Sequence, residues 1–551
     1  MTRHGSRWAI GWVGLSLAIS LVVVVPVGVV LASTLRSSDG EWAHLASTLL
    51  PGYARNTAVL AVCVCAIAAV IGTASAWLVT ACEFPGRRAL GWALLLPLAI
   101  PGYLAAYAYT DLLQVSGPLQ STVRGWLGLS VADGWVLRVR SLGGAIFILA
   151  VTLYPYVYLA ARAAFLEQST RALEVARSLG RGPVAAFFRV ALPLARPAIV
   201  AGTALVLMET LADFGAVEYC AVDTFATGVY RAWRSLESPT AAAQLAALLL
   251  GVVSVVLLAE YLTRRRAKTY AQGAPHHATQ RLQLSPAQSA AAIAACALPV
   301  LAGFVVPAAV FLVLAVDAAD TPALSLAIGT GLRTIAVAAI AAILAVGLAM
   351  LIATARRWHP GPVIRTAANT CRLGYALPGT VVGIGLLIPL TSADHAANAF
   401  LQQTLGLRPG LLLTGTAVAV VIGYQTRFLG VALSILRPGL DRIRPAMDDA
   451  ARTLGASPLG LIARVHLPIM RASLLTGVLI VFVECVKELP ATLMLRPFNF
   501  DTLAVRAYQL ASDERLDEAA VAGLFIIAVG LLPIALLAAA LPRPNQAPPT
   551  P

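Results

Sequence analysis

Charged side chains are scarce in this chain of 551 residues: only 12% are Asp, Glu, Lys or Arg, whereas 59% are hydrophobic. Soluble domains carry about one quarter charged residues. The mean hydropathy of the chain is +0.81. This composition excludes an ordinary water-soluble domain and makes lipid the expected solvent of the chain.

Closely spaced cysteine pairs of the CxxC type are absent. The seven cysteines are Cys63, Cys65, Cys82, Cys220, Cys296, Cys371 and Cys485, and most of them lie in apolar runs. This spacing indicates neither a disulfide framework nor a zinc site. Residues two apart on a helix, such as Cys63 and Cys65, point in different directions, so we expect buried free thiols and assign no metal site.

Apolar runs long enough to cross a bilayer are abundant. A membrane helix needs about 20 apolar residues, and we predict about twelve spans in an all-α polytopic membrane protein. They lie near residues 8–32, 57–81, 88–112, 142–165, 196–217, 240–262, 290–316, 331–354, 372–392, 412–435, 472–493 and 517–541. Residues 1–33 resemble a signal peptide, but their apolar stretch exceeds the usual h-region of 7–15 residues, so we interpret them as a retained first helix.

The basic residues predict the orientation of these spans. With the N-terminus in the cytoplasm, about 26 of the 40 Lys and Arg residues fall in cytoplasmic segments and roughly 12 fall outside. We therefore expect both termini inside. The net charge of +14 is spread through the loops instead of forming one stripe, which argues against nucleic acid as a partner.

One loop pattern occurs twice at a constant offset of 275 residues. Glu174-Val-Ala-Arg-Ser-Leu-Gly180 aligns with Asp449-Ala-Ala-Arg-Thr-Leu-Gly455, and Leu192-Pro193 aligns with Leu467-Pro468. The match pairs Ala176 with Ala451 and Arg177 with Arg452. An ungapped repeat of this length indicates internal duplication.

The duplication divides the chain into two halves of six spans each. Upstream of the loops, Ala99-Ile-Pro-Gly102 resembles Ala376-Leu-Pro-Gly379, and we expect each string inside the third span of its half. The predicted halves are residues 1–262 and 290–551, joined by a cytoplasmic linker at 263–289. An even number of crossings makes the two repeats parallel, unlike inverted repeats.

Each repeated loop, at about 166–195 and 436–471, is expected to form two short helices. Gly180 suits a C-terminal cap, and Gly182-Pro183 or Ser457-Pro458 supplies a restart. We expect Leu192-Pro193 and Leu467-Pro468 to end the second helix before the next span. An exposed amphipathic elbow presented twice predicts docking to a two-fold partner, although plain basic anchors at the membrane surface are the simpler alternative.

The string Glu-x-Ala-x-x-x-Gly followed by Leu-Pro resembles the EAA loop of ABC-importer permeases. The resemblance implies the type I permease fold and ATPase contact through Glu174, Ala176, Arg177, Gly180, Pro193, Asp449, Ala451, Arg452, Gly455 and Pro468. It also implies two ATPase copies, a periplasmic binding protein and a multi-pass location in the bacterial inner membrane. A P-loop needs Gly-Lys-Ser/Thr, but Ala267 and Val486 precede the only lysines, Lys268 and Lys487. ATP and Mg²⁺ are thus expected on a partner, with no enzyme activity and no cofactor in this chain.

Five charged residues in predicted spans are candidates for a substrate pathway or gate: Glu209, Asp213, Glu484, Lys487 and Glu488. Charges inside a membrane are costly and usually functional. Spacing of i, i+4 predicts one helix face for each carboxylate pair, and four carboxylates would suit a hard cation. The alternative is that these residues hold helices together or, for Glu484 and Lys487, neutralise each other.

The segments after the two loops resemble fused ferric-iron importer permeases. The strings are Met208-Glu-Thr-Leu-Ala-Asp-Phe-Gly215, Thr224 to Arg231, Lys487-Glu-Leu-Pro-Ala491 and Arg496 to Thr502. This resemblance implies Fe(III) as cargo and alternating access. Importers of thiamine, polyamines, phosphonates or sulfate share the EAA loop and remain alternatives. A proton-coupled transporter or channel would not need duplicated docking loops.

Overall fold

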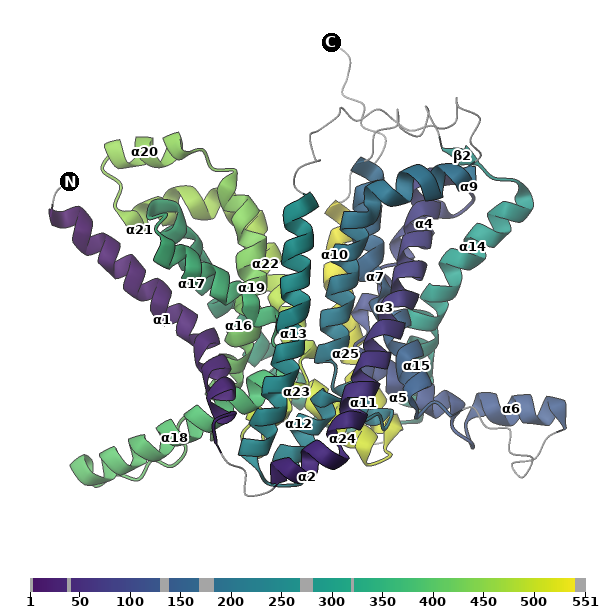
Figure 1. Cartoon of the computed structure of the whole chain (residues 1–551), viewed down its shortest axis with the longest axis horizontal. Helices are drawn as coiled ribbons and strands as arrows, with labels where there is room; N and C mark the ends of the chain where they lie inside the picture. The colour runs from purple at the N-terminus through teal and green to yellow at the C-terminus, as the bar shows by residue number, and fades with distance from the viewer. Residues whose placement is uncertain are drawn as a thin grey trace, which may run out of the picture. The chain divides into compact units, whose positions relative to one another are not determined.

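The computed structural model describes residues 3–36, 41–128, 138–167, 183–267, 281–318 and 322–540. Nearly all regular structure in these residues is helical (Figure 1). The first helices are α1 (Arg3–Ser33), α2 (Glu41–Thr48), α3 (Leu50–Ala81), α4 (Arg87–Ala93), α5 (Gly102–Leu113), α6 (Pro118–Leu127), α7 (Leu142–Glu167), α9 (Pro183–Ala186), α10 (Leu192–Ala212), α11 (Gly215–Tyr219), α12 (Phe225–Arg234) and α13 (Pro239–Ala267).

The remaining α-helices follow a short strand pairing. They are α14 (Pro286–Val300), α15 (Val306–Asp317), α16 (Ala323–Trp358), α17 (Pro362–Leu373), α18 (Gly379–Leu405), α19 (Val418–Asp441), α20 (Pro445–Thr453), α21 (Pro458–Leu461), α22 (Leu467–Lys487), α23 (Pro490–Leu495), α24 (Leu503–Ser512) and α25 (Leu516–Ala540). Two 3₁₀ turns, η1 (Leu96–Ala99) and η5 (Gly374–Ala376), and three π-helical turns, η3 (Phe187–Ala191), η4 (Leu301–Val305) and η6 (Ile462–His466), complete the helical elements. Strands β1 (Cys82–Glu83) and β2 (Leu282–Gln283) pair in parallel.

The predicted all-helical membrane architecture is confirmed. In the described residues, eleven helices are long and apolar enough to span a membrane, or twelve if one bent pair counts as a span. That pair is Arg87–Ala99 with Gly102–Leu127, bent by 93°. Each predicted span overlaps one of these helices or the bent pair.

The Pro-Gly strings lie at helix breaks. The first lies at the bend of the third span, and the second directly precedes the span Gly379–Leu405 instead of lying inside it. Pro101 and Pro378 stand at the N-caps of α5 and α18, after the 3₁₀ turns η1 and η5. Proline lacks an N–H donor and disfavours helical backbone in the residue before it. Ile100 is accordingly extended, with φ −102° and ψ 113°. Hydropathy cannot detect such a break, because apolar residues continue through it.

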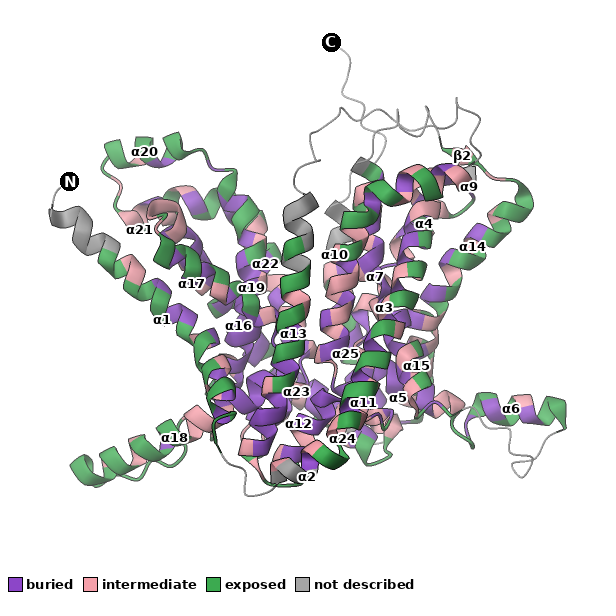
Figure 2. Cartoon of the chain, viewed as in Figure 1, coloured by how far each residue is buried: buried purple, intermediate pink, exposed green. Residues whose placement is uncertain are grey.

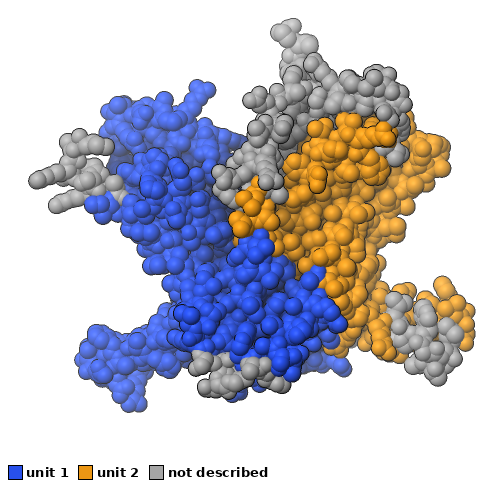
Figure 3. Space-filling view, viewed as in Figure 1, with its two compact units in different colours: residues 1–58, 211–255, 319–522 blue, residues 59–210, 256–318, 523–551 orange. Residues whose placement is uncertain are grey.

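Unit 1 is one of two compact units (Figure 3) and contains residues 1–58, 211–255 and 319–522. Helices α16, α19 and α22 pack on one another, and α1 packs on α17 and α18. Ala341, Ala345 and Ala349 of α16 are fully buried, and such small residues allow close helix approach in membranes. Figure 2 shows exposed positions along α1, whereas α12 and α23 are mostly buried.

Unit 2 contains residues 59–210, 256–318 and 523–551. Helix α7 packs on α5 and η1, while α14 packs on α4 and α15 packs on α5. The Tyr158 hydroxyl of α7 donates to the Gly91 carbonyl at 2.8 Å. Each unit therefore includes the first helical segment of the opposite predicted half: α1 belongs to unit 1, and α14 with α15 belongs to unit 2.

Candidate functional site

The second repeated loop forms the expected pair of short helices, α20 and α21. Gly455 follows α20 with φ +80°, a left-handed conformation that glycine adopts without strain. Its N–H donates to the Arg452 carbonyl, and the Ala456 N–H donates to the Ala451 carbonyl, each at 3.0 Å. These two bonds make a Schellman cap, which ends α20 abruptly.

The restart at Ser457-Pro458 is also confirmed, but the predicted helix end at Leu467-Pro468 is wrong. The Ser457 side chain accepts the Gly460 N–H, and Pro458 occupies the first turn of α21. The helix then continues from Pro458 to Lys487 as one span. The π-helical turn η6 precedes Pro468, and its wider turn accommodates the missing proline donor. Pro193 likewise lies in the first turn of α10, after η3.

A buried carboxylate fastens α20 to its own helix bundle. Asp448 accepts hydrogen bonds from Arg357 Nε at 2.7 Å and His466 Nε2 at 3.0 Å. The other Arg357 nitrogens donate to the Leu440 and Ile443 carbonyls at the end of α19. Since a carboxylate only accepts, His466 must carry its proton on Nε2. This triad joins α16, α20 and η6.

The charge on Asp448 is favoured by its partners. Burial alone raises the pKa of this carboxyl, but hydrogen bonds from Arg357 and His466, with their charges, outweigh burial and lower the pKa below its ordinary value. A lowered pKa contributes stability at neutral pH, and this contribution is lost as the pH falls through the lowered value. The anchor is therefore expected to persist throughout the neutral range.

The face of the second loop that points away from the bundle is apolar with charged neighbours. Leu454 is 88% exposed, Leu459 is 75% exposed, and Met447 is also exposed. Asp449 and Arg452 form an exposed i, i+3 ion pair at 3.6 Å. An apolar patch with a charged rim is typical of a protein docking surface. Ala451, between them, is half-buried.

Half of the first repeated loop, residues 168–182, lies outside the described residues. This applies to Glu174, Ala176, Arg177 and Gly180. Its described end contains Pro193, which is exposed. The ATPase-docking role stays a prediction for both copies of the loop.

Asp213 and Glu488 lie just beyond the ends of their helices. Helix α10 ends at Ala212, and Asp213 accepts the backbone N–H groups of Ala216 and Val217 at 3.1 Å each. Helix α22 ends at Lys487, and Glu488 accepts the Ala491 N–H at 2.9 Å. The expectation that each i, i+4 pair shares one helix face is wrong. The helices break there because each carboxylate satisfies free N–H groups at the start of α11 or α23.

Glu488 is also held in a buried ion pair with Arg427 of α19. The two side chains are 4% and 9% exposed. Beside them, the Tyr424 and Thr492 hydroxyls are hydrogen-bonded at 2.8 Å. Gly379 permits this packing, because a Cβ there would lie 2.8 Å from Glu488 Oε1. The arrangement favours a packing role for Glu488 over contact with a transported ion.

Within the described part of unit 1, Asp213, Glu484 and Glu488 do not gather into a metal site. Glu484 Oε1 lies 3.9 Å from Lys487 Nζ, as the neutralising alternative predicts. Glu209 lies in α10 and is half-buried. In the part of the chain that the structure describes, no group of three His, Cys, Asp or Glu side chains is arranged to hold a metal ion. A pathway lining by all four carboxylates, with Glu209 of unit 2 included, stays a prediction.

Sequence reasoning missed Arg427, Arg357, Asp448 and His466. Arg427 had a clear signal, since it is a charge within the predicted span 412–435. The sequence marked Arg357 only as one of the basic residues that predict the orientation of the spans. Asp448 immediately precedes the repeat-aligned Asp449, and only the structure distinguishes the buried carboxylate from the exposed one.

A polytopic helical protein with an EAA-type docking loop has the features of an ABC-importer permease. The family described as "Binding-protein-dependent transport system inner membrane component" matches residues 17–268 and 345–544. The chain belongs to this family. It is thus a transport permease and not an enzyme, and ATP hydrolysis is carried out by a separate ATPase.

Several curated proteins are similar to the chain. The Fe(3+)-transport system permease protein FbpB 2 of Haemophilus influenzae is 24% identical over 487 residues, covering 88% of each chain. The molybdenum transport system permease protein ModB of Escherichia coli is 33% identical over 141 residues, 26% of this chain and 58% of its own. The sulfate transport system permease protein CysT of Salmonella typhimurium is 27% identical over 215 residues, 37% of this chain and 72% of its own.

Proposed function

We propose that this permease imports ferric iron across the bacterial inner membrane. The supporting observation is the extent of similarity to the Fe(3+) permease, which covers 88% of both chains and so includes both halves. The matches to the molybdenum and sulfate permeases cover 141 and 215 residues, which is less than one predicted half of this chain. The strings after the two loops, from Met208 and from Lys487, favour the same cargo.

The proposed assembly is one chain with two ATPases and a periplasmic ferric-binding protein. The halves 1–262 and 290–551 would each supply one ATPase seat, with Ala451, Arg452, Gly455 and Leu454 in the second seat. ATP-driven closure of the ATPase pair would move the coupling helices and open the permease outward, and hydrolysis would reset it. Iron would be substrate, delivered by the binding protein, with no resident metal required.

Glu209, Asp213, Glu484, Lys487 and Glu488 are proposed to act at the gate more than as iron ligands. The buried Glu488–Arg427 pair and the Glu484–Lys487 pair support this role, since both are satisfied within the protein. Helix breaks at Asp213 and Glu488 are places where a span can bend during alternating access.

Uptake by proteoliposomes tests the cargo. The permease would be reconstituted with its ATPase, and radioactive Fe(III), molybdate and sulfate would each be offered with the corresponding binding protein. We expect ATP-dependent accumulation of iron only. Accumulation of molybdate or sulfate without iron would overturn the cargo while leaving the importer class intact.

A further inference from the structure

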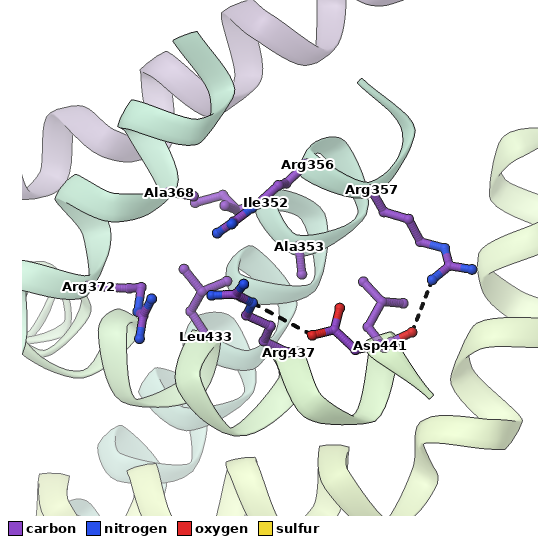
Figure 4. Close-up of a pocket in the computed structure, with 10 residues that line it drawn as sticks. Ile352, Ala353, Arg356, Arg357, Ala368, Arg372, Leu433, Arg437 and Asp441 are labelled. Atoms are coloured by element: carbon purple, nitrogen blue, oxygen red, sulfur yellow. Dashed lines mark hydrogen bonds and ion pairs between the residues drawn. The ribbon is translucent and has the colours of Figure 1, made fainter. Parts of the chain in front are cut away.

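Arginine side chains from three helices line a cavity of about 220 Å³ in unit 1 (Figure 4). Arg356 and Arg357 come from α16, Arg372 from α17, and Arg437 from α19. The apolar wall includes Ile352 and Leu433, which are buried. The cavity thus combines cationic groups with a hydrocarbon surface.

The positive charge around this cavity exceeds the negative charge. Arg357 donates to Asp448, to the Leu440 carbonyl of α19 and to the Ile443 carbonyl just after α19, so it belongs to the triad that anchors the second repeated loop. Asp441 is the carboxylate of the cavity wall, and it lies 3.7 Å from Arg437. Within the described ranges, no carboxylate lies within 4.0 Å of Arg356. The positive charges around the cavity repel one another, which is unfavourable. A bound anion would replace this repulsion with attraction.

Helix dipoles explain only part of this arrangement. Arg356 and Arg372 stand in the last turns of α16 and α17, where a cation balances the partial negative charge of the helix end. That effect does not require guanidinium groups from three helices to share one cavity. Guanidinium groups bind phosphate oxygens through paired N–H donors, so their convergence fits a phosphate group.

The cavity lies at the end of α16 that is expected to meet the cytoplasmic membrane surface. Trp358, directly after Arg356 and Arg357, packs edge-on against Trp12 of α1, with ring centroids 5.4 Å apart. Tryptophan is enriched at the membrane interface, and the excess of arginine places this end inside. Phosphates of anionic lipids lie at the same level and attract basic residues.

We propose that this pocket binds a phosphate group at the cytoplasmic membrane surface, from an anionic lipid headgroup or a free phosphate compound. The bound phosphate joins the ends of α16, α17 and α19. Arg357 lines the same pocket and donates to Asp448. A bound phosphate therefore stabilises the end of the helix bundle that carries the second repeated loop. ATPase coupling is then stronger in membranes that contain anionic lipid.

Native mass spectrometry of the full chain, alone and with its ATPase, tests this site. Phosphatidylglycerol, phosphatidylcholine and inorganic phosphate are the probes. The test variant is Arg356→Gln with Arg372→Gln. The matched control is Arg333→Gln with Arg408→Gln, which removes the same charge from the expected periplasmic side. The test variant lacks two basic residues that would each attract an anionic headgroup. It should therefore bind phosphatidylglycerol about thirtyfold more weakly than the wild type.

Each outcome decides the proposal. Selective loss of phosphatidylglycerol in the test variant, with phosphatidylcholine unaffected, supports a lipid headgroup. Loss of inorganic phosphate binding without any lipid preference supports the free compound as the source. If the test variant binds phosphatidylglycerol and inorganic phosphate as well as the wild type does, the proposed site is overturned. Displacement of the lipid by the ATPase would also overturn it, because the pocket would then be a protein contact.

Discussion

Replacing Gly180 and Gly455 together by leucine is expected to reduce ATP-driven uptake to background while membrane levels stay normal. Gly455 has φ +80°, and its α20 cap presents Leu454 outward. A Cβ at this position has open space around it within 4 Å, so we expect a leucine side chain to occupy space that the docked ATPase needs. Losing one docking hot spot costs about 2 kcal/mol, which lowers affinity about thirtyfold. Uptake and ATPase co-purification measure the effect.

Gly406 supplies a matched control for this substitution. It ends α18 with φ +67° and has open space around its Cβ position. Gly406→Leu therefore carries the same backbone strain of about 1–2 kcal/mol on the opposite expected side of the membrane. Its uptake should remain near that of the wild type. Equal losses in both variants would show strain instead of lost docking.

Arg427→Met is expected to destabilise the permease by about 3–5 kcal/mol, because it leaves the buried Glu488 carboxylate without its cation. Glu488→Gln alone should also destabilise, since Arg427 then loses its counter-charge. The double variant should recover most of the stability. Thermal unfolding in nanodiscs, followed as a double-mutant cycle, measures the coupling between the two residues.

The same cycle separates packing from a direct role in transport. If Glu488 only holds α23 to α19, the double variant should regain uptake together with stability. Recovered stability with abolished iron uptake would contradict the packing role and return Glu488 to the pathway. The Arg515–Glu518 pair, in which the Arg515 side chain is 53% exposed, is the control, and Arg515→Met should change unfolding far less than Arg427→Met.

The sequence predicted features that depend on local pattern. Span positions follow from hydropathy over about 20 residues. The restart at Ser457-Pro458 follows from residue chemistry at helix ends, and the second loop bears it out. Gly455, which aligns with the predicted cap Gly180, ends α20. The family followed from the repeated loop, because docking requires defined side chains at fixed spacing.

Features that depend on distant contacts were beyond the sequence. The breaks at Pro101 and Asp213 lie within continuous apolar runs, so hydropathy extends through them. The packing of α1 in unit 1 and of α14 in unit 2 joins segments that are far apart along the chain. The Asp448 anchor depends on Arg357, which is 91 residues away.

The anchor also shows that the two repeats are not equivalent. At the offset of 275, Leu173 and Ala191 correspond to Asp448 and His466. Neither residue can form the hydrogen bonds of the second copy. The docking pattern is therefore present in the sequence of both loops, whereas the Asp448 hydrogen bonds that hold the loop to its bundle belong to the second copy.

The central claim is that one chain supplies both ATPase seats. The mass of the purified complex tests this claim most directly. In nanodiscs with ATP, the complex should contain a single 57.4 kDa permease chain and two ATPase subunits. Two permease chains with two ATPases would contradict the account, since each chain would then offer one seat.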